Sequence, residues 1–174
     1  MTMMKNPVLA ISGSASSPSS NARLLEAIGA SFPEKGLRPD TLLRELPLYG
    51  PHLDKAPLPA VVEQWRAQAA EVRAVIITTP EYLHNIPAVL KNGLEWLKTS
   101  GEFFGKAVLP ITFTPHPPRG EHAMESLRKS LQALEARIVV ELPLYQNALS
   151  KNPAGGWILE GEVHEWLEAA LEML

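Results

Sequence analysis

The chain has 174 residues, of which 45% are hydrophobic and 20% are charged, as is typical of one soluble globular domain. Its formal net charge of −3 gives no basic field for nucleic acid. It contains no cysteine, which excludes disulfides, thiolate metal sites and cysteine nucleophiles. No apolar run approaches the roughly 20 residues needed to span a membrane. We therefore expect a cytoplasmic single domain over residues 1–174 that binds neither nucleic acid nor membrane.

The first half of the chain alternates short apolar runs with amphipathic segments. Val8–Ser12 is continuously apolar at its start, as in a parallel strand covered on both faces. Leu24, Leu25 and Ile28 follow helical spacing, and Ser20 or Asn21 is the expected cap of that helix. The predicted elements, in order, are a strand over 8–12, a helix over 22–32, a weaker strand over 40–46, a proline-rich loop over 47–59, a helix over 59–72 and a central strand over 74–78.

The second half continues the same alternation. Its predicted elements are a helix starting near Pro87, a strand over 106–113, a helix after Gly120, a strand over 137–140, a loop over 152–156 and a helix from about Glu160. Five short buried strands joined by helices predict a three-layer α/β fold with a parallel sheet. The flavodoxin-like strand order 2-1-3-4-5 is the expected one, with its ligand crevice beyond the carboxyl ends of strands one and three.

Three loops should meet at that crevice. The loop after the first strand carries five serine hydroxyls after Gly13 and no acidic residue. Backbone amides and hydroxyls at a helix N-terminus suit a bound phosphate, although a serine-rich turn that only caps a helix fits equally well. The loop over 80–87 could lie along a flat ring, and the loop over 113–120 closes the site. A phosphate cradle beside an aromatic-ring slot predicts a mononucleotide site, for which FMN is the usual occupant in this fold.

Other chemistry has weaker support in the sequence. There is no P-loop signature, no dinucleotide fingerprint after Gly13 and no HExxH spacing among the five histidines. Glu81 is either a general acid or base, or a solvated turn residue, and we favour the second. Three tryptophans at helical positions are expected to pack in the core or at an interface, and Phe103-Phe104 to be buried, to line the cleft or to meet a second subunit. The tryptophans are Trp65, Trp96 and Trp166.

Three segments resemble the NADPH-dependent FMN reductase family. Residues Gly13–Asn21 are similar to its phosphate loop, G-S-x-R-x-x-S-x-N. Residues Thr79–Trp96 are similar to its longer and more specific motif, T-P-E-Y-N-x-S-I-P-x-x-L-K-N-A-I-D-W. Phe104-Gly105-Lys106 matches the lead into its fourth strand. The segments occur in the family's order, and the resemblance covers most of the chain.

The resemblance implies a flavodoxin-like FMN enzyme. It would pass a hydride from NADPH or NADH through the flavin to a small acceptor such as a flavin or quinone, as a homodimer or homotetramer. No protein residue need act as acid or base, so no catalytic residue and no metal ligand is assigned. Ser14, Ser19 and Asn21 would hold the phosphate, and residues 80–84 would run along the isoalloxazine. The full cofactor-binding set is Ser12, Ser14, Ser16, Ser19, Ser20, Asn21, Pro80, Glu81, Tyr82, Leu83, His84 and Asn85.

The chain departs from the family pattern at three places. Ser16 stands where the family has an arginine, Leu83 where it has an asparagine, and the usual glycine-rich fourth loop is the proline-rich segment 114–120. Arg119 or Lys98 could restore the missing charge. Two alternatives therefore stay open: a flavin-binding electron carrier without its own pyridine-nucleotide reaction, and a non-catalytic relative that binds another phosphorylated ligand.

Overall fold

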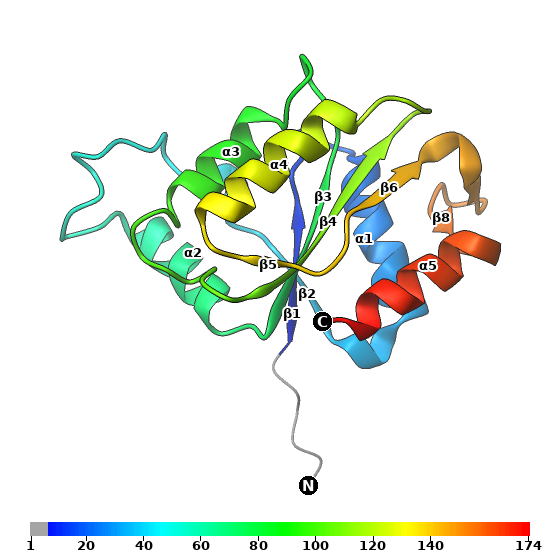
Figure 1. Ribbon diagram of the computed structural model, residues 1–174, viewed down its shortest axis with the longest axis horizontal. Helices are drawn as coiled ribbons and strands as arrows, with labels where there is room; N and C mark the ends of the chain where they lie inside the picture. Colours follow the sequence, from blue (N-terminus) through cyan, green and yellow to red (C-terminus); the bar gives the residue numbers. More distant parts are fainter. Residues whose placement is uncertain (1–6) are drawn as a thin grey trace, which may run out of the picture.

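A parallel β-sheet with helices on both faces forms the core of the computed structural model, which describes residues 7–174 (Figure 1). The main path of the sheet runs β2-β1-β3-β4-β5, which confirms the predicted strand order. The strands are β1 Val8–Ser12, β2 Leu37–Pro39, β3 Ala74–Thr79, β4 Ala107–Thr114, β5 Arg137–Ile138 and β6 Leu142–Tyr145, with β7 Ser150–Lys151 and β8 Trp157–Ile158 in a separate antiparallel pair. The helices are α1 Ser20–Ser31, α2 Ala60–Ala70, α3 Ala88–Glu95, α4 Glu121–Ala133 and α5 Gly161–Glu172.

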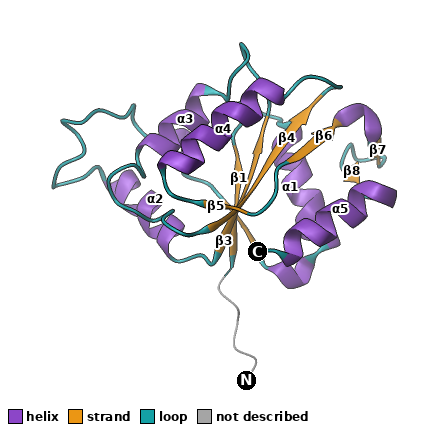
Figure 2. Ribbon diagram, viewed as in Figure 1, coloured by secondary structure: helices purple, strands orange, loops and turns teal. Residues whose placement is uncertain are grey.

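Each face of the sheet has its own apolar core. Helices α2, α3 and α4 cover one face, and α1 and α5 cover the other (Figures 1 and 2). Side chains alternate between the faces along a strand, so Val8 and Ala10 enter the α1–α5 core while Leu9 and Ile11 enter the α2–α4 core. Both sets must be apolar because both faces are covered, which is why β1 and β3 lack the polar alternation of a half-exposed strand.

The predicted second strand over 40–46 is wrong. The strand that pairs with β1 is Leu37–Pro39, and the predicted segment instead contains the 3-10 turn η2, Leu43–Glu45. The Asp40 carboxylate accepts hydrogen bonds from the amides of Leu42 and Leu43, with an O···N distance of 2.9 Å to Leu42. An aspartate that bonds its own following backbone favours a turn over a strand.

The last predicted strand is correct only at its start. β5 is limited to Arg137–Ile138. After a short break, β6 continues the pairing with β4. The sequence did not predict β6 because this strand contains Pro143. The predicted loop over 152–156 joins β7 to β8, a hairpin in which the Lys151 ammonium lies 4.5 Å from the centre of the Trp157 ring. These short edge elements depend on tertiary contacts more than on local sequence.

The large aromatic side chains fall into two groups. Trp65, Trp96 and Phe103 are buried, whereas Trp166 is about half exposed and Phe104 is 70% exposed. Trp65 and Trp96 thus lie in the core, one of the two positions expected for the tryptophans. Trp166 does not, so an interface position for it stays a prediction, and of the phenylalanine pair only Phe104 is accessible to a partner. Within residues 7–174, no helix combines the length and apolarity that crossing a membrane requires.

Candidate cofactor-binding site

Three loops that follow β1, β3 and β4 surround one cavity of about 250 Å³ at the carboxyl edge of the sheet. This confirms that the loops converge as the strand order predicted. Hydroxyls, amides and backbone groups dominate its polar lining, and Glu81 is its one acidic side chain among residues 7–174. The lining residues are Ser14, Ser16, Pro18, Ser20, Asn21, Pro80, Glu81, Tyr82, Phe113, Thr114, Pro115, Arg119 and Gln146.

The serine loop leaves β1 at a position that only glycine fits. The Gly13 amide donates to the Thr78 carbonyl at 2.7 Å, which ties the loop to β3. A Cβ on Gly13 would lie 2.7 Å from Leu90 Cδ2 of α3 and 3.1 Å from Thr78 O, so a larger residue would push the loop away from β3. Gly13 thus fixes where the serine loop begins.

Ser19 caps α1, one residue before the expected caps Ser20 and Asn21. Its hydroxyl accepts a hydrogen bond from the Ala22 amide at 3.2 Å and lies 3.5 Å from the Ser12 hydroxyl. The first turn of α1 carries no acidic side chain, so no carboxylate cancels the positive end of the helix dipole. The local chemistry therefore favours an anion at this end of α1.

Asn21 joins two strands beneath the cavity. Its Nδ2 donates to the Phe113 carbonyl at 3.4 Å, and its own carbonyl accepts from the Thr78 hydroxyl at 3.2 Å. The side chain is 3% exposed, and its Oδ1 has no hydrogen-bond partner within residues 7–174. A buried polar atom without a partner costs free energy, so this acceptor points to a ligand that donates to it.

Glu81 is a helix cap rather than a solvated turn residue. Its Oε2 accepts hydrogen bonds from the amides of Gly120 at 3.1 Å and Ala123 at 3.0 Å, and the side chain is 8% exposed. Gly120 precedes α4 with φ 107° and has no side chain with which to cap it. The favoured sequence interpretation of Glu81 is therefore wrong: its carboxylate satisfies the orphan amides of α4.

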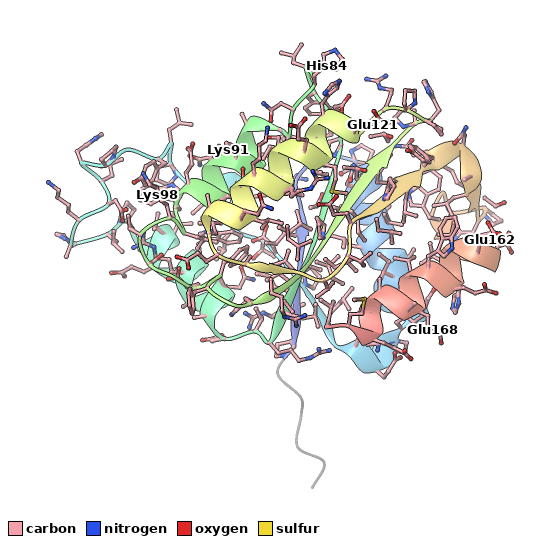
Figure 3. The ribbon with its side chains drawn as sticks, in the orientation of Figure 1. His84, Lys91, Lys98, Glu121, Glu162 and Glu168 are labelled. Carbon is pink, nitrogen blue, oxygen red and sulfur yellow. The ribbon has the colours of Figure 1, made fainter. Side chains whose placement is uncertain are left out.

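Residues Tyr82–Asn85 form a tight hairpin that projects beyond the sheet, as His84 shows in Figure 3. Leu83 and His84 both have positive φ, at 49° and 57°, as a type I′ turn requires. Leu83 is 99% exposed and does not line the cavity. The Tyr82 hydroxyl lies 3.3 Å from the Ser16 hydroxyl, so the hairpin meets the serine loop across the cavity mouth.

The predicted cofactor-binding residues fall into three places. Seven line the cavity, namely Ser14, Ser16, Ser20, Asn21, Pro80, Glu81 and Tyr82. Ser12 and Ser19 lie at the base of the loop, joined to each other. Leu83, His84 and Asn85 line an outer groove of about 960 Å³ between α3 and α4, where the His84 and His122 ring centres are 4.8 Å apart.

One lining residue had no sequence signal. Gln146 reaches the cavity from η3, Gln146–Ala148, which follows the β6 strand that the sequence reading missed. Of the two cations considered as replacements for the loop arginine, Arg119 lines the cavity, whereas Lys98 lies beyond α3, far from the hairpin (Figure 3). Arg119 is also held locally, since its carbonyl accepts from the Thr114 hydroxyl at 2.7 Å.

Relatives of known activity match most of this chain. It is 30% identical over 174 residues to the NAD(P)H-dependent FMN reductase of Pseudomonas aeruginosa, covering 96% of this chain and 92% of that one. It is also 33% identical to the NADH:(hydroxy)cinnamate reductase subunit CrdA of Vibrio ruber, covering 84% and 72%, and 30% identical to the quinone reductase of Escherichia coli K12, covering 75% and 70%.

Solved structures agree on the fold. The flavoenzyme NAD(P)H:(acceptor) oxidoreductase of Paracoccus denitrificans superposes with a TM-score of 0.80 at 20% identity, over 97% of this chain and 96% of that one. A flavodoxin mutant from Pseudomonas aeruginosa superposes with a TM-score of 0.58 at 16% identity, over 97% and 98%. At these identities the likeness establishes the flavodoxin-like architecture.

The model of the NADPH-dependent FMN reductase family matches residues 6–148, which include β1 to β6 and every loop of the cavity. The match agrees with the relatives, all of which are reductases. FMN and NAD(P)H are accordingly the cofactors expected for an oxidoreductase of this kind. By its sequence, its strand order and the loops around its cavity, the chain belongs to the NADPH-dependent FMN reductase family.

Proposed function

We propose that residues 1–174 form one FMN-binding domain whose cavity holds FMN with its phosphate in the serine loop and its ring beside the Pro80–Tyr82 turn. The observation that carries this proposal is the pairing of an uncancelled α1 N-terminus with the buried, unpartnered Oδ1 of Asn21. The amides and hydroxyls of the loop suit the phosphate, and a ribityl hydroxyl would donate to Asn21. The residues present thus fit FMN without the family's loop arginine.

Bound FMN would supply the two-electron chemistry between NAD(P)H and a small acceptor. The protein would position the flavin and exclude water. Glu81, the one carboxylate that lines the cavity among residues 7–174, would not be needed as an acid or base, since it already accepts two backbone amides. Tyr82 and Ser16 would close the cavity mouth through their paired hydroxyls. We infer an NAD(P)H oxidoreductase that reduces a flavin, quinone or similar small molecule.

The same cavity would also serve a flavin-binding electron carrier. A net charge of −3 favours the enzyme, because electron carriers generally use a strong charge to steer their protein partners. The third alternative, a non-catalytic relative that binds another phosphorylated ligand, shares the loop but has no use for a ring slot. The net charge therefore favours the reductase over the carrier, and the ring slot favours it over the non-catalytic relative.

We further propose that the enzyme works in the cytoplasm as a homodimer or homotetramer. The outer groove between α3 and α4, together with the fully exposed Leu83, offers a surface for a second copy. Phe104, 70% exposed, is the one member of the phenylalanine pair that could join such an interface. Light scattering at micromolar concentration tests this: a monomer would contradict it.

An absorption spectrum of the purified protein tests the cofactor, and anaerobic mixing with NADPH or NADH tests the reaction. We expect bound FMN to give visible absorption bands that bleach rapidly on mixing. A flavin that binds but does not bleach would favour the electron carrier. A colourless protein with no FMN-dependent thermal shift, and with another phosphorylated molecule bound, would favour the non-catalytic relative.

A further inference from the structure

The serine loop is held from outside by an arginine that belongs to another element. Arg44 lies in η2, Leu43–Glu45, and its Nη2 donates to the Ser14 carbonyl at 3.0 Å and to the Ser16 carbonyl at 3.1 Å. We propose that Arg44 is the positioning residue for the phosphate loop, replacing from 28 residues away the cation that Ser16 does not provide. This inference rests on the proposed function, because it concerns the phosphate site of FMN.

Arg44 contacts the loop from outside the lining of the cofactor cavity. It lines a separate polar cavity of about 260 Å³ together with Ser12, Ala22, Asp40 and Thr41. That cavity shares no lining residue with the one formed by the three loops. The guanidinium therefore does not touch the proposed cofactor, and its effect must pass through the two carbonyls that it holds.

Holding those carbonyls also sets the direction of the loop amides. The peptide bonds after Ser14 and Ser16 are trans, so each amide hydrogen points away from the carbonyl oxygen of the same peptide. With both oxygens turned toward Arg44, the amides of Ala15 and Ser17 turn toward the cavity side. Within residues 7–174 neither amide has a hydrogen-bond partner. The Ser16 amide between them donates to the Ser14 hydroxyl at 3.2 Å, so the loop offers two alternate free amides to an anion.

The turn that carries Arg44 is itself rigid. Asp40 is fixed to β1 through a hydrogen bond from its amide to the Ala10 carbonyl at 2.8 Å, and its carboxylate caps the turn. Burial raises the pKa of Asp40, while the backbone hydrogen bonds to its carboxylate and the charge of Arg44 favour its ionised form. On the other side, Leu43 is 2% exposed and packs so closely on Gly93 of α3 that a Cβ there would lie 2.2 Å from Leu43 Cδ1.

Charge supports the same assignment. A guanidinium hydrogen-bonded to two carbonyls of the serine loop adds a positive charge beside the loop that would hold the phosphate, and opposite charges attract. Arginine suits this place because its planar fork reaches two oxygens in a fixed geometry, which an ammonium group does not. Arg44 would thus stabilise the phosphate twice, by orienting amides and by its own charge.

The test is to compare FMN with riboflavin, which lacks the phosphate. The full-length apoprotein would be titrated with each flavin, and the quenching of flavin fluorescence would give both dissociation constants. Arg44→Ala should raise the constant for FMN by about tenfold and change that for riboflavin by less than about twofold. Arg44→Gln, which keeps a donor but no charge, should fall between wild type and Arg44→Ala. Arg137→Ala, an exposed arginine on β5, is the matched control and should change neither constant.

Comparing wild type with the variants distinguishes the role of Arg44 from the location of the phosphate site. If wild-type protein binds FMN and riboflavin equally, the phosphate-loop site of the proposed function is wrong. If wild type prefers FMN and Arg44→Ala keeps that preference, the inference about Arg44 is wrong. The inference would also be wrong if Arg44→Ala and Arg44→Gln weakened the binding of FMN and riboflavin equally. A purely structural role would affect both flavins alike, with or without the phosphate.

Discussion

The Glu81 carboxylate and the Ala123 amide are joined by a 3.0 Å hydrogen bond across 42 residues of chain. This contact fastens the turn after β3 to the first turn of α4, and so relates two walls of the cavity to each other. A carboxylate at a helix N-terminus also interacts favourably with the helix dipole.

Glu81→Ala should lower the free energy of unfolding by about 1–2 kcal/mol, because it leaves the amides of Gly120 and Ala123 without their cap. Glu81→Gln keeps an acceptor oxygen and should lose less. Urea unfolding of the apoprotein measures both. If Glu81 were a general acid or base, Glu81→Gln would instead slow flavin reduction strongly while leaving stability intact, and single-turnover mixing with NADPH would reveal it.

Ser19→Ala should weaken FMN binding by about 1–2 kcal/mol through loss of a hydroxyl in the phosphate loop. It should also cost about 1 kcal/mol of stability, because Ser19 is the N-cap of α1. Fluorescence titration and urea unfolding separate the two effects. Ser31→Ala, at the exposed other end of α1, is the control. If the dissociation constant of Ser19→Ala for FMN matched that of the control, the phosphate would lie elsewhere.

Gly120→Ala should destabilise the protein more than Gly101→Ala, although both glycines have positive φ, at 107° and 84°. At Gly101 nothing lies within 4 Å of an added Cβ, so only the cost of about 1–2 kcal/mol for a left-handed backbone applies. At Gly120 the Cβ would lie 3.0 Å from Thr112 Oγ1 and 3.2 Å from Thr114 Cγ2. The difference between the two unfolding free energies reports this close approach together with the larger φ of Gly120. Equal values would mean that neither adds a cost.

Asp54→Asn should destabilise the protein near neutral pH but not in acid. The Thr99 hydroxyl first, and then Arg66, hold the pKa of Asp54 below its usual range, with its Oδ2 2.6 Å from Thr99 Oγ1 and its Oδ1 2.7 Å from Arg66 Nη2. A lowered pKa adds stability above about pH 4, the range of a free aspartate, that is lost as pH falls through the folded value. Urea unfolding near neutral pH and in acid measures the difference in unfolding free energy between wild type and variant. We expect this difference to disappear in acid, whereas a constant difference would refute the ionic role of Asp54.

Much of the site could be predicted because it depends on local chemistry. A continuous apolar run, a serine-rich loop without carboxylates and an amphipathic helix specify a strand, a turn and a helix with little help from the rest of the chain. The same is true of Gly13, whose place at the end of β1 marks a turn. Since the ends of neighbouring parallel strands share one edge, the strand order alone brought the three loops together.

The errors occurred where distant contacts outweigh local preference. The segment over 40–46 has the leucines of a strand, yet Asp40 caps a turn there and Leu43 packs into a gap that Gly93 leaves open. Gln146 enters the cavity only because β6 extends the sheet past a break after β5. Neither relation leaves a pattern in the nearby sequence.

The sequence by itself determined the α/β class and the family, because periodicity and motifs are properties of contiguous residues. The strand order followed by analogy with the flavodoxin-like fold. Only the tertiary structure decided what the charged groups do. Glu81 became a cap for α4, and Arg44 became the cation behind the serine loop, since each finds its partners more than 25 residues away. Hydrogen bonds need atoms within about 3 Å, and that proximity is created by folding.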